Sequence, residues 1–515
     1  MSYLELLKLA LPEAIVVITA LVVLTIGLTT GREAAGPTVS TARPTRDADN
    51  TSSTLSAALC SLVAVVGLAV AIGAVLMLPP NATLFGGMLV ITPLTSLFKI
   101  ICIALAFFTV LLTTSEPRNH SGLPHPGEYL AIVLLATVGL MLLVGSEELL
   151  MIFIGLELLG LSLYVMAAFD KTDPRSAEAG LKYFLFGSTS SAFTLFGISL
   201  IYGMSGTTGL AAISAKLATA PVQPLLAVGI IMTLVGFAFK IAAAPFHLWA
   251  PDAYQGAPVP SAAFIASGSK VASFVVLGKI VLVGFAPVHG SAAWHGMVAG
   301  WSPVLAVLAA FSILLGNLVA LAQSNVRRLL AYAAVAHGGY TLIGLVAARR
   351  DGFSAALFYT TTYAITLVGA FGVVGFVRRE TGGDDLSNFS GLYSRSPLLA
   401  GCMAIFMLSL AGIPPLAGFF GKFYLFSVAL RASPNHGLLW LVALALFGSF
   451  ISLYYYLMIL KFIFVDKRAD AALDRSSLIG HHGLAMATIC LLAAAVLLLG
   501  MMPDILAAQI LAAIP

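Results

Sequence analysis

Three lysines lie near the middle of long apolar stretches of the sequence: Lys240, Lys270 and Lys422. An ammonium group deep in hydrocarbon costs about 2.5–3.5 kcal/mol on insertion scales, so each needs a reason to be there. Two of them also stand close to helix-breaking residues, because Pro245 follows Lys240 and Pro415 precedes Lys422. A helix break frees backbone groups that find no water inside a bilayer. These coincidences favour a polar pathway over accidents of packing.

A proton relay is the chemistry that such lysines permit. A lysine amine in low dielectric binds its proton less tightly, and a nearby carboxylate restores the affinity, so moving one charge switches the site. Glu157 is the acidic residue central to an apolar stretch, and it is the candidate countercharge for Lys182 or Lys240. A static buried ion pair that fixes helix packing is the competing interpretation. Several lysines against one glutamate favour the relay.

Two histidines belong to the same set of candidates. His337 is central to its stretch, with Gly338 and Gly339 beside it, and both a relay role and a plain interhelical hydrogen bond stay open. His247 lies at the end of the broken stretch, and its role is open as well. The histidines lack paired spacing and the four cysteines form no C-x-x-C pair, so we expect no metal site and no iron–sulfur cluster. The segment AGFFGKFY lacks the spacing of a phosphate-binding loop.

The composition places these residues in a membrane. Of 515 residues, 60% are hydrophobic and only 9% are charged, whereas soluble domains carry about 25% charged residues. Apolar runs of about 18 residues or more predict an all-α integral membrane protein with fourteen transmembrane helices. Their approximate ranges are 10–30, 55–78, 93–114, 128–146, 148–169, 178–203, 223–250, 258–284, 301–323, 328–347, 353–377, 397–430, 437–464 and 483–511. The first range lacks a cleavage pattern and is expected to be a retained span.

The segments between the spans carry the topology signal. Lys and Arg are more frequent in the odd-numbered loops, fourteen against five, which predicts that these loops are cytoplasmic and that both termini lie on the other side. The polar stretch 32–54 is expected to be a flexible loop. Lys99, Lys279 and Lys461 lie nearer span ends, and we expect their amines to extend to the interface.

The two predicted breaks suggest an internal repeat. The seventh and twelfth spans are broken, the twelfth at Pro414 and Pro415, and units of five spans insert with alternating orientation. We therefore predict two inverted five-helix repeats, 128–284 and 285–464, each containing a broken helix. A three-helix segment, 1–127, would precede them, and a C-terminal helix, 465–515, would follow.

Several long stretches resemble a known family, the antiporter-like membrane subunits of respiratory complex I. They are KYFLFGSTSSAFTLFGISLIYGMSG, AFKIAAAPFHLWAPDAYQGAPVP, LLGNLVALAQSNVRRLLAYAAVAHGGY and LSLAGIPPLAGFFGKFYLF. The early LPEAIVVITALVVL, the fourteen spans and an end directly after the last span resemble the N subunit family within that group.

The resemblance implies a proton-translocating subunit of NADH:quinone oxidoreductase in the cell inner membrane. Its partners would be the other membrane-arm and peripheral-arm subunits, which would hold NADH, FMN, the iron–sulfur clusters and the quinone, while this chain would bind no cofactor of its own. By resemblance, the family's proton-relay residues fall on Glu157, Lys182, Lys240, Lys270 and Lys422.

Two alternatives share much of this pattern. The same module occurs in multisubunit cation/proton antiporters and membrane-bound hydrogenases, which neighbouring genes would distinguish. A non-pumping scaffold that keeps the fold is the other, and the full set of lysines together with Glu157 argues against it.

Overall fold

The computed structural model of the chain describes residues 3–34, 46–113, 125–219, 223–432, 436–466 and 483–514. The first part contains α1 (Tyr3–Leu9), α2 (Leu11–Ala34), α3 (Arg46–Leu76), β1 (Ala82–Leu84), η1 (Phe85–Gly87), β2 (Leu89–Ile91), α4 (Pro93–Thr113), α5 (Pro126–Gly145), α6 (Leu149–Ala167), α7 (Pro174–Ser205) and α8 (Leu210–Thr219). The middle contains α9 (Pro224–Lys240), α10 (Trp249–Gly256), α11 (Val259–Ala266), α12 (Gly268–Lys279), η2 (Ile280–Gly284) and η3 (Ala286–Val288).

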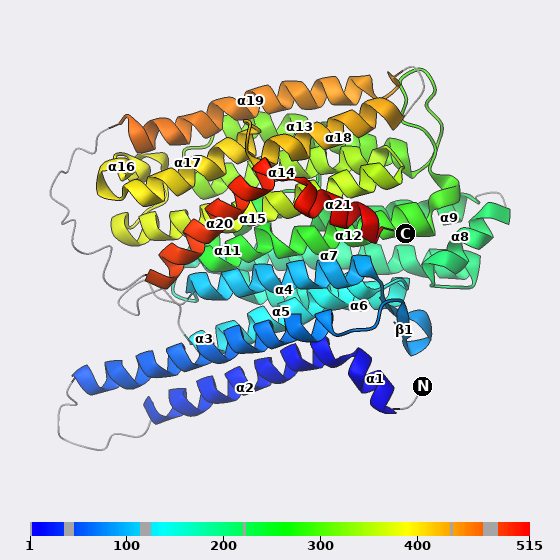
Figure 1. Ribbon diagram of the computed structural model, residues 1–515. Coiled ribbons are helices and arrows are strands. Elements are labelled where there is room, and N and C mark those ends of the chain that lie inside the picture. The colour runs from blue at the N-terminus through cyan, green and yellow to red at the C-terminus, as the bar shows by residue number, and fades with distance from the viewer. Residues whose placement is uncertain are drawn as a thin grey trace.

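The second half of the chain is helical as well. It contains α13 (Trp301–Leu321), α14 (Val326–Val346), α15 (Arg350–Thr381), η4 (Leu386–Phe389), α16 (Leu392–Arg395), α17 (Pro397–Ala411), α18 (Ala417–Ala432), α19 (Leu439–Phe464), α20 (Gly483–Met501) and α21 (Asp504–Ala513). Figure 1 shows the long helices running side by side, with α2 and α3 at one edge of the bundle and α19 at the opposite edge. The expected all-α membrane fold is confirmed, apart from the short β1–β2 hairpin.

Twelve helical stretches in the described residues are long and apolar enough to cross a membrane. Two further predicted spans, the seventh and the twelfth, are each divided into two shorter helices, α9 with α10 and α17 with α18. The predicted total of fourteen spans and the inverted repeats stay predictions, as do the four segment boundaries. Both α1 and α21 lie at the same end of the bundle (Figure 1).

Two further discontinuities were not expected. The eighth predicted span is interrupted at Ser267, which has φ −112° and ψ −82°, and the fourteenth is interrupted before Asp504. A proline at 503 explains the second, because it cannot continue a hydrogen-bonded helix. No proline lies within five residues of Ser267, but Gly268 follows it directly, and Gly/Ser pairs are common sites of helix kinks.

The stretch 32–54 differs from the expected loop. Helix α2 continues to Ala34 and α3 already begins at Arg46, so the prediction of a loop was wrong for these two flanks. Extending an existing helix is far easier than starting one, so apolar helices run on into polar sequence. Residues 35–45, the centre of the stretch, lie outside the described residues.

The centre of the bundle consists of the helices that carry the candidate site. The span formed by α11, α12 and η2 is almost wholly buried, and so are α14 and α15. Close approach of α13 to α14 depends on small residues: a Cβ on Gly339 would lie 2.8 Å from the Ala309 carbonyl oxygen. The lysines and the histidine on these helices are therefore enclosed by protein rather than lipid.

Candidate functional site

The first break lies directly after Lys240, the last residue of α9. The Lys240 side chain is buried, and its Nζ has no hydrogen-bond partner among the described residues. It lies 5.6 Å from the centre of the Tyr164 ring on α6. A Cβ on Gly160 would approach Nζ to 2.9 Å, so the amine rests against the bare backbone of α6. No carbonyl or carboxylate of the described residues therefore fixes this amine by a hydrogen bond.

The backbone between α9 and α10 is bonded within the protein. Ala242, at φ 56°, donates to the Phe239 carbonyl at 3.0 Å, and Ala244 donates to Ser312 Oγ on α13 at 2.9 Å. Trp249 Nε1 donates to the same Phe239 carbonyl at 3.0 Å. A non-helical stretch inside a membrane protein persists only when its polar groups are satisfied in this way. Pro245 lies within this stretch, where it was predicted.

Glu157 does not pair as expected. Its Oε1 accepts a hydrogen bond from Ser191 Oγ of α7, and it forms no ion pair with Lys182 or Lys240 within 4 Å. Its charge still acts on Lys240, one helix away. The expected pairing with Lys182 was wrong because Ser191 lies nine residues further along α7, about 13 Å from the level of Lys182.

Lys182 belongs instead to a half-exposed charged cluster at one end of the bundle. Its Nζ lies 2.6 Å from Glu178 and 2.8 Å from Asp252, and Arg328 Nη1 lies 2.7 Å from the other oxygen of Asp252. A cavity of about 240 Å3 opens beside this cluster, lined by Arg175 and Gln255 among others. The charged cluster is therefore open to water, and Lys182 lies at the surface of the bundle, where a proton could enter, rather than in the interior.

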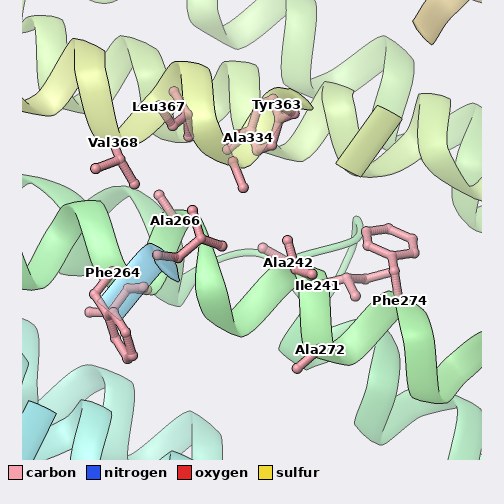
Figure 2. Close-up of a cluster of buried hydrophobic side chains, with 14 of the residues drawn as sticks. Ile241, Ala242, Phe264, Ala266, Ala272, Phe274, Ala334, Tyr363, Leu367 and Val368 are labelled. Atoms are coloured by element: carbon pink, nitrogen blue, oxygen red, sulfur yellow. The ribbon is translucent and has the colours of Figure 1, made fainter. Parts of the chain in front are cut away.

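Lys270 lies just after the interruption at Ser267. It is 2% exposed, and its Nζ donates to the Ala334 carbonyl of α14 at 2.6 Å. The Tyr363 ring lies 5.6 Å from the same Nζ. Figure 2 shows apolar residues of the first break and of α11 and α12 facing Ala334 and Tyr363 of α14 and α15. The side chain of Lys270 is therefore enclosed between α12, α14 and α15.

His337 is fixed by two tyrosines. Its Nδ1 lies 2.6 Å from the Tyr359 hydroxyl and its Nε2 lies 2.9 Å from the Tyr456 hydroxyl, and the ring is buried. Both Lys270 and Lys422 act on it electrostatically.

The Tyr363 ring lies near both His337 and Lys270, and the Tyr340 ring lies near both His337 and Lys422. The imidazole, with hydrogen bonds on both nitrogens, therefore shares a neighbouring tyrosine with each lysine, an arrangement that suits proton transfer.

Lys422 is held at the second break. Its Nζ donates to the carbonyls of Leu410 and Ala411 at 3.1 and 2.9 Å and to Ser449 Oγ at 2.9 Å. Gly412, at φ 88°, ends α17 in the left-handed conformation that favours glycine. The carbonyls at a helix C-terminus carry partial negative charge, which stabilises an ammonium. Pro414 and Pro415 follow in the non-helical link to α18.

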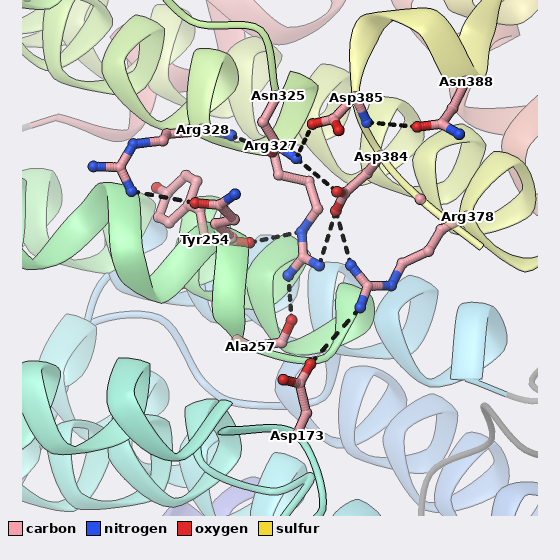
Figure 3. Close-up of polar contacts among 12 residues, drawn as sticks. Asp173, Tyr254, Ala257, Asn325, Arg327, Arg328, Arg378, Asp384, Asp385 and Asn388 are labelled. Atoms are coloured by element: carbon pink, nitrogen blue, oxygen red, sulfur yellow. Dashed lines mark hydrogen bonds and ion pairs between the residues drawn. The ribbon is translucent and has the colours of Figure 1, made fainter. Parts of the chain in front are cut away.

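Two consecutive arginines at the start of α14 bind the short helix α10. Arg327 donates to the Tyr254 carbonyl at 2.8 Å and to the Ala257 carbonyl at the end of α10, and it pairs with Asp384 at 3.2 Å (Figure 3). Arg328 holds Asp252 at the other end of α10. The helix that follows the first break is therefore attached to the helix that carries His337.

Asp384 completes this set of contacts around α10, which consists of Arg327, Arg328, Asp252 and Asp384 and is called the clamp below. It accepts from Asn325 at 2.6 Å and pairs with Arg378 at 2.9 Å. Burial raises the pKa of the Asp384 carboxyl, but Arg327 and Arg378 outweigh burial, so the pKa lies below its usual value of 3.8. The carboxylate is thus charged at neutral pH.

Sequence reasoning missed two buried lysines nearby. Lys99 and Lys279 were expected to extend to the interface, and this was wrong, because both are about 4% exposed. Lys99 pairs with Glu13 at 2.6 Å, and Lys279 donates to the Val144 and Ser146 carbonyls. These partners belong to other helices, and they stabilise both lysines inside the bundle. Lys461, by contrast, is 58% exposed near Asp466, as expected.

His247 is buried beside the first break, and its Nδ1 has no hydrogen-bond partner in the described part of the chain. Its ring faces the edge of Tyr332 at 6.2 Å. Within the described residues no group of three or more His, Cys, Asp or Glu side chains could hold a metal ion. The described side chains of the site are amines, imidazoles, carboxylates and hydroxyls, all of which can carry protons.

Comparison with known sequences places this geometry in a family. Residues 146–452 match the family described as NADH:quinone oxidoreductase/Mrp antiporter, TM. NADH-quinone oxidoreductase subunit N 2 of Acidobacterium capsulatum is 46% identical over 512 residues, 98% of each chain. Subunit N of Desulforamulus reducens is 38% identical over 86% of this chain and 89% of the relative.

Solved structures agree. A chain of respiratory complex I from Thermus thermophilus is 30% identical, with a TM-score of 0.72 over 96% of this chain and 98% of that chain. A chain of the Mrp complex from Dietzia is 21% identical, with a TM-score of 0.76 over 98% of this chain and 97% of that chain, a likeness that concerns the fold alone.

Proposed function

This chain belongs to the NADH-quinone oxidoreductase subunit N family, and from this we propose that it is a proton-translocating membrane subunit of an NADH:quinone oxidoreductase. The observation that carries the proposal is that His337 has a tyrosine hydroxyl on each ring nitrogen and shares the neighbouring rings of Tyr363 with Lys270 and of Tyr340 with Lys422. Buried ionisable groups in a membrane protein are expensive and mark ion pathways. A scaffold without transport has no need for this chain of groups.

The proposed route has an entrance, a switch and a holding site. Protons enter at the wet cluster of Lys182 and Asp252, and Lys240 with Glu157 forms the switch. Lys270 and His337 pass the proton between the two halves, and Lys422 holds it at the second break.

The difference between the two breaks supports this order. Lys240 has no bonded partner within the described residues, whereas Lys422 is bonded to two carbonyls and a hydroxyl. Glu157 acts electrostatically on Lys240, and no hydrogen bond within the described residues fixes the amine of Lys240 in place. Lys240 is therefore the member of the pair that a change in Glu157 can switch.

The energy and the redox chemistry come from partner subunits in this proposal. NADH, FMN, iron–sulfur clusters and quinone are bound there, and this chain contributes no redox centre. The two breaks belong to inverted five-helix repeats, and the odd-numbered loops face the cytoplasm, so both termini lie on the opposite side. The likeness to the Mrp complex concerns the fold alone, so it favours no antiporter role.

Two alanine variants test the function. Lys240→Ala and Lys422→Ala are introduced into the complete complex, and proton translocation into vesicles is measured together with quinone reduction. We expect both rates to fall at least about tenfold, because loss of a positioned acid–base group typically costs on the order of 100-fold or more, while the amount of assembled complex stays near normal.

Lys461→Ala is the matched control, because this lysine lies at a span end with its side chain 58% exposed. It should pump normally. Normal pumping by fully assembled Lys240→Ala and Lys422→Ala complexes would contradict the proposed function.

A further inference from the structure

A buried asparagine, Asn317 on α13, lies beside the candidate site and has no part in the proposed route. Its side chain is 0% exposed, and it belongs to the stretch LLGNLVALAQSNVRRLLAYAAVAHGGY, of which the route uses only His337. An amide inside a membrane protein costs free energy unless its N–H groups and its oxygen are hydrogen-bonded. The bonds that Asn317 makes therefore indicate what it does.

Asn317 joins two tyrosines from different helices. Its Nδ2 donates to the Tyr340 hydroxyl of α14 at 2.9 Å and to the Ile313 carbonyl at 2.7 Å. Its Oδ1 accepts from the Tyr455 hydroxyl of α19 at 3.0 Å. The bond to a carbonyl, which can only accept, determines which end of the amide is the nitrogen. Both N–H groups are used, so the amide has one fixed orientation.

Bare backbone brings the helices close enough for these bonds. A Cβ on Gly316 would lie 2.5 Å from the Ala336 nitrogen, so α13 touches the backbone of α14 one residue before Asn317. A Cβ on Gly448 of α19 would lie 2.8 Å from Asn317 Nδ2 and 2.9 Å from the Tyr340 hydroxyl. The amide and the hydroxyl are therefore enclosed by three helices.

Tyr340 connects Asn317 to the relay. Its ring lies 5.3 Å from Lys422 Nζ, and it meets the His337 ring edge to face at a centroid distance of 5.7 Å. An aromatic ring over an ammonium attracts it and so favours the protonated form. Because Asn317 holds the hydroxyl end of Tyr340, the ring stays beside the amine.

We propose that Asn317 is a positioning residue for proton transfer at the second break: it holds the Tyr340 hydroxyl and thereby keeps the ring against the Lys422 amine. An amide neither gains nor loses a proton near neutral pH, so Asn317 acts through Tyr340 and carries no proton itself. A bond that serves helix packing alone is the competing role. This inference rests on the proposed proton translocation and adds to it a residue that does not ionise.

The first test is a double-mutant cycle of proton translocation in the complete complex. Asn317→Leu keeps the approximate size and branching of the side chain and removes its bonds to both tyrosines, whereas Tyr340→Phe removes only the hydroxyl. We expect each to lower the rate about threefold to tenfold, less than the roughly 100-fold that a misplacement of about 1 Å can cost. The double variant should be no slower than the slower single variant, because the two residues act as one unit. Effects that multiply, or a normal rate for Tyr340→Phe, would overturn the proposal.

The second test separates positioning from packing by the pH dependence of the rate. Loss of the ring contact disfavours the ammonium form of Lys422, so the alkaline limb of the pH profile should move to lower pH by about half a unit in Asn317→Leu. The other groups around the amine stay unchanged: the Leu410 and Ala411 carbonyls, Ser449 and His337. A rate lowered equally at every pH would assign Asn317 a packing role and overturn the proposal.

Ser302→Ala is the matched control. Ser302 also lies on α13, is 2% exposed and donates to the Val346 carbonyl at the end of α14 at 3.1 Å, so the variant removes another buried bond between the same helices. It should pump normally with an unchanged pH profile. A loss equal to that of Asn317→Leu would show that any buried bond between α13 and α14 has this effect, and the proposal would be rejected.

The two proposals fail in different ways. Loss of pumping in Lys422→Ala with normal pumping in Asn317→Leu and Tyr340→Phe leaves the proposed function standing and rejects this inference. Normal pumping in assembled Lys240→Ala and Lys422→Ala complexes rejects the function itself.

Discussion

The carbonyl of Ile241 lies against Gly338: a Cβ on Gly338 would be 3.3 Å from the Ile241 oxygen. Ile241 is the first residue after α9, and Gly338 is the neighbour of His337 on α14. The break beside Lys240 thus touches the helix that carries the central imidazole. The break is therefore joined to the helix that carries His337 by this contact and by the two arginines that bind α10.

The bare backbone of α6 beside Lys240 predicts the effect of a single methyl group. Gly160→Ala places a Cβ 2.9 Å from Lys240 Nζ and 3.1 Å from the Tyr164 hydroxyl, so the flexible amine must move away. Misplacement of a reacting group by about 1 Å costs up to about 100-fold in rate, and we expect pumping to fall within that range. Gly203→Ala on α7 is the control, because its Cβ meets nothing within 4 Å. Proton translocation by assembled complex is the measurement, and an unaffected Gly160→Ala would show that the amine's position is unimportant.

His337 separates a relay role from a structural one. His337→Gln keeps hydrogen-bonding capacity for Tyr359 and Tyr456 but cannot carry a proton in the same way. We expect pumping to fall at least about tenfold while the thermal stability of the complex changes little. Tyr456→Phe removes one hydrogen bond, worth about 1 kcal/mol, and should be milder. A His337→Gln complex that loses stability in proportion to pumping would assign the residue a packing role.

Arg327 is predicted to be the most sensitive residue of the clamp. Arg327→Ala leaves Asp384 with less compensation and frees the carbonyls of Tyr254 and Ala257. Breaking one partner of a buried charge pair costs about 3–5 kcal/mol, so we expect a marked drop in thermal stability. Arg327→Lys, which retains the charge, should recover part of it.

The exposed pair of Arg349 and Asp351 provides the comparison for that experiment, because both side chains are at least 40% exposed. Arg349→Ala should change stability by about 0–1 kcal/mol. Equal losses in the two alanine variants would show that the clamp contributes nothing special.

Asp384 predicts how the clamp responds to acid. Its pKa is lowered in the folded protein, so its contribution is present above the unfolded value of about 4 and is lost as the pH falls through the lower folded pKa. Thermal unfolding of the detergent-solubilised protein should therefore show a loss of stability below about pH 4 that Asp384→Asn reduces. An identical acid profile for the variant would remove Asp384 from this account.

Sequence patterns predicted what depends on local composition. Apolar runs predicted the spans, and prolines predicted where α9 and α17 end. Sequence patterns could not predict which side chains bond to each other across helices, because that depends on the rotation and depth of each helix in the bundle. Glu157 therefore meets Ser191 rather than Lys182. The acceptor of the Lys270 amine is the backbone carbonyl of Ala334, and such an acceptor cannot be recognised from the type of the residue.

Trp249 gives the first break a built-in optical reporter. Its ring stacks on Tyr183 at 4.1 Å, and its indole N–H is bonded to the Phe239 carbonyl next to Lys240. The chain has four tryptophans, and replacing Trp294, Trp301 and Trp440 with phenylalanine would leave this fluorophore alone. Its emission colour and quenching would then register, in real time, whether the end of α9 shifts while electrons flow through the neighbouring subunits.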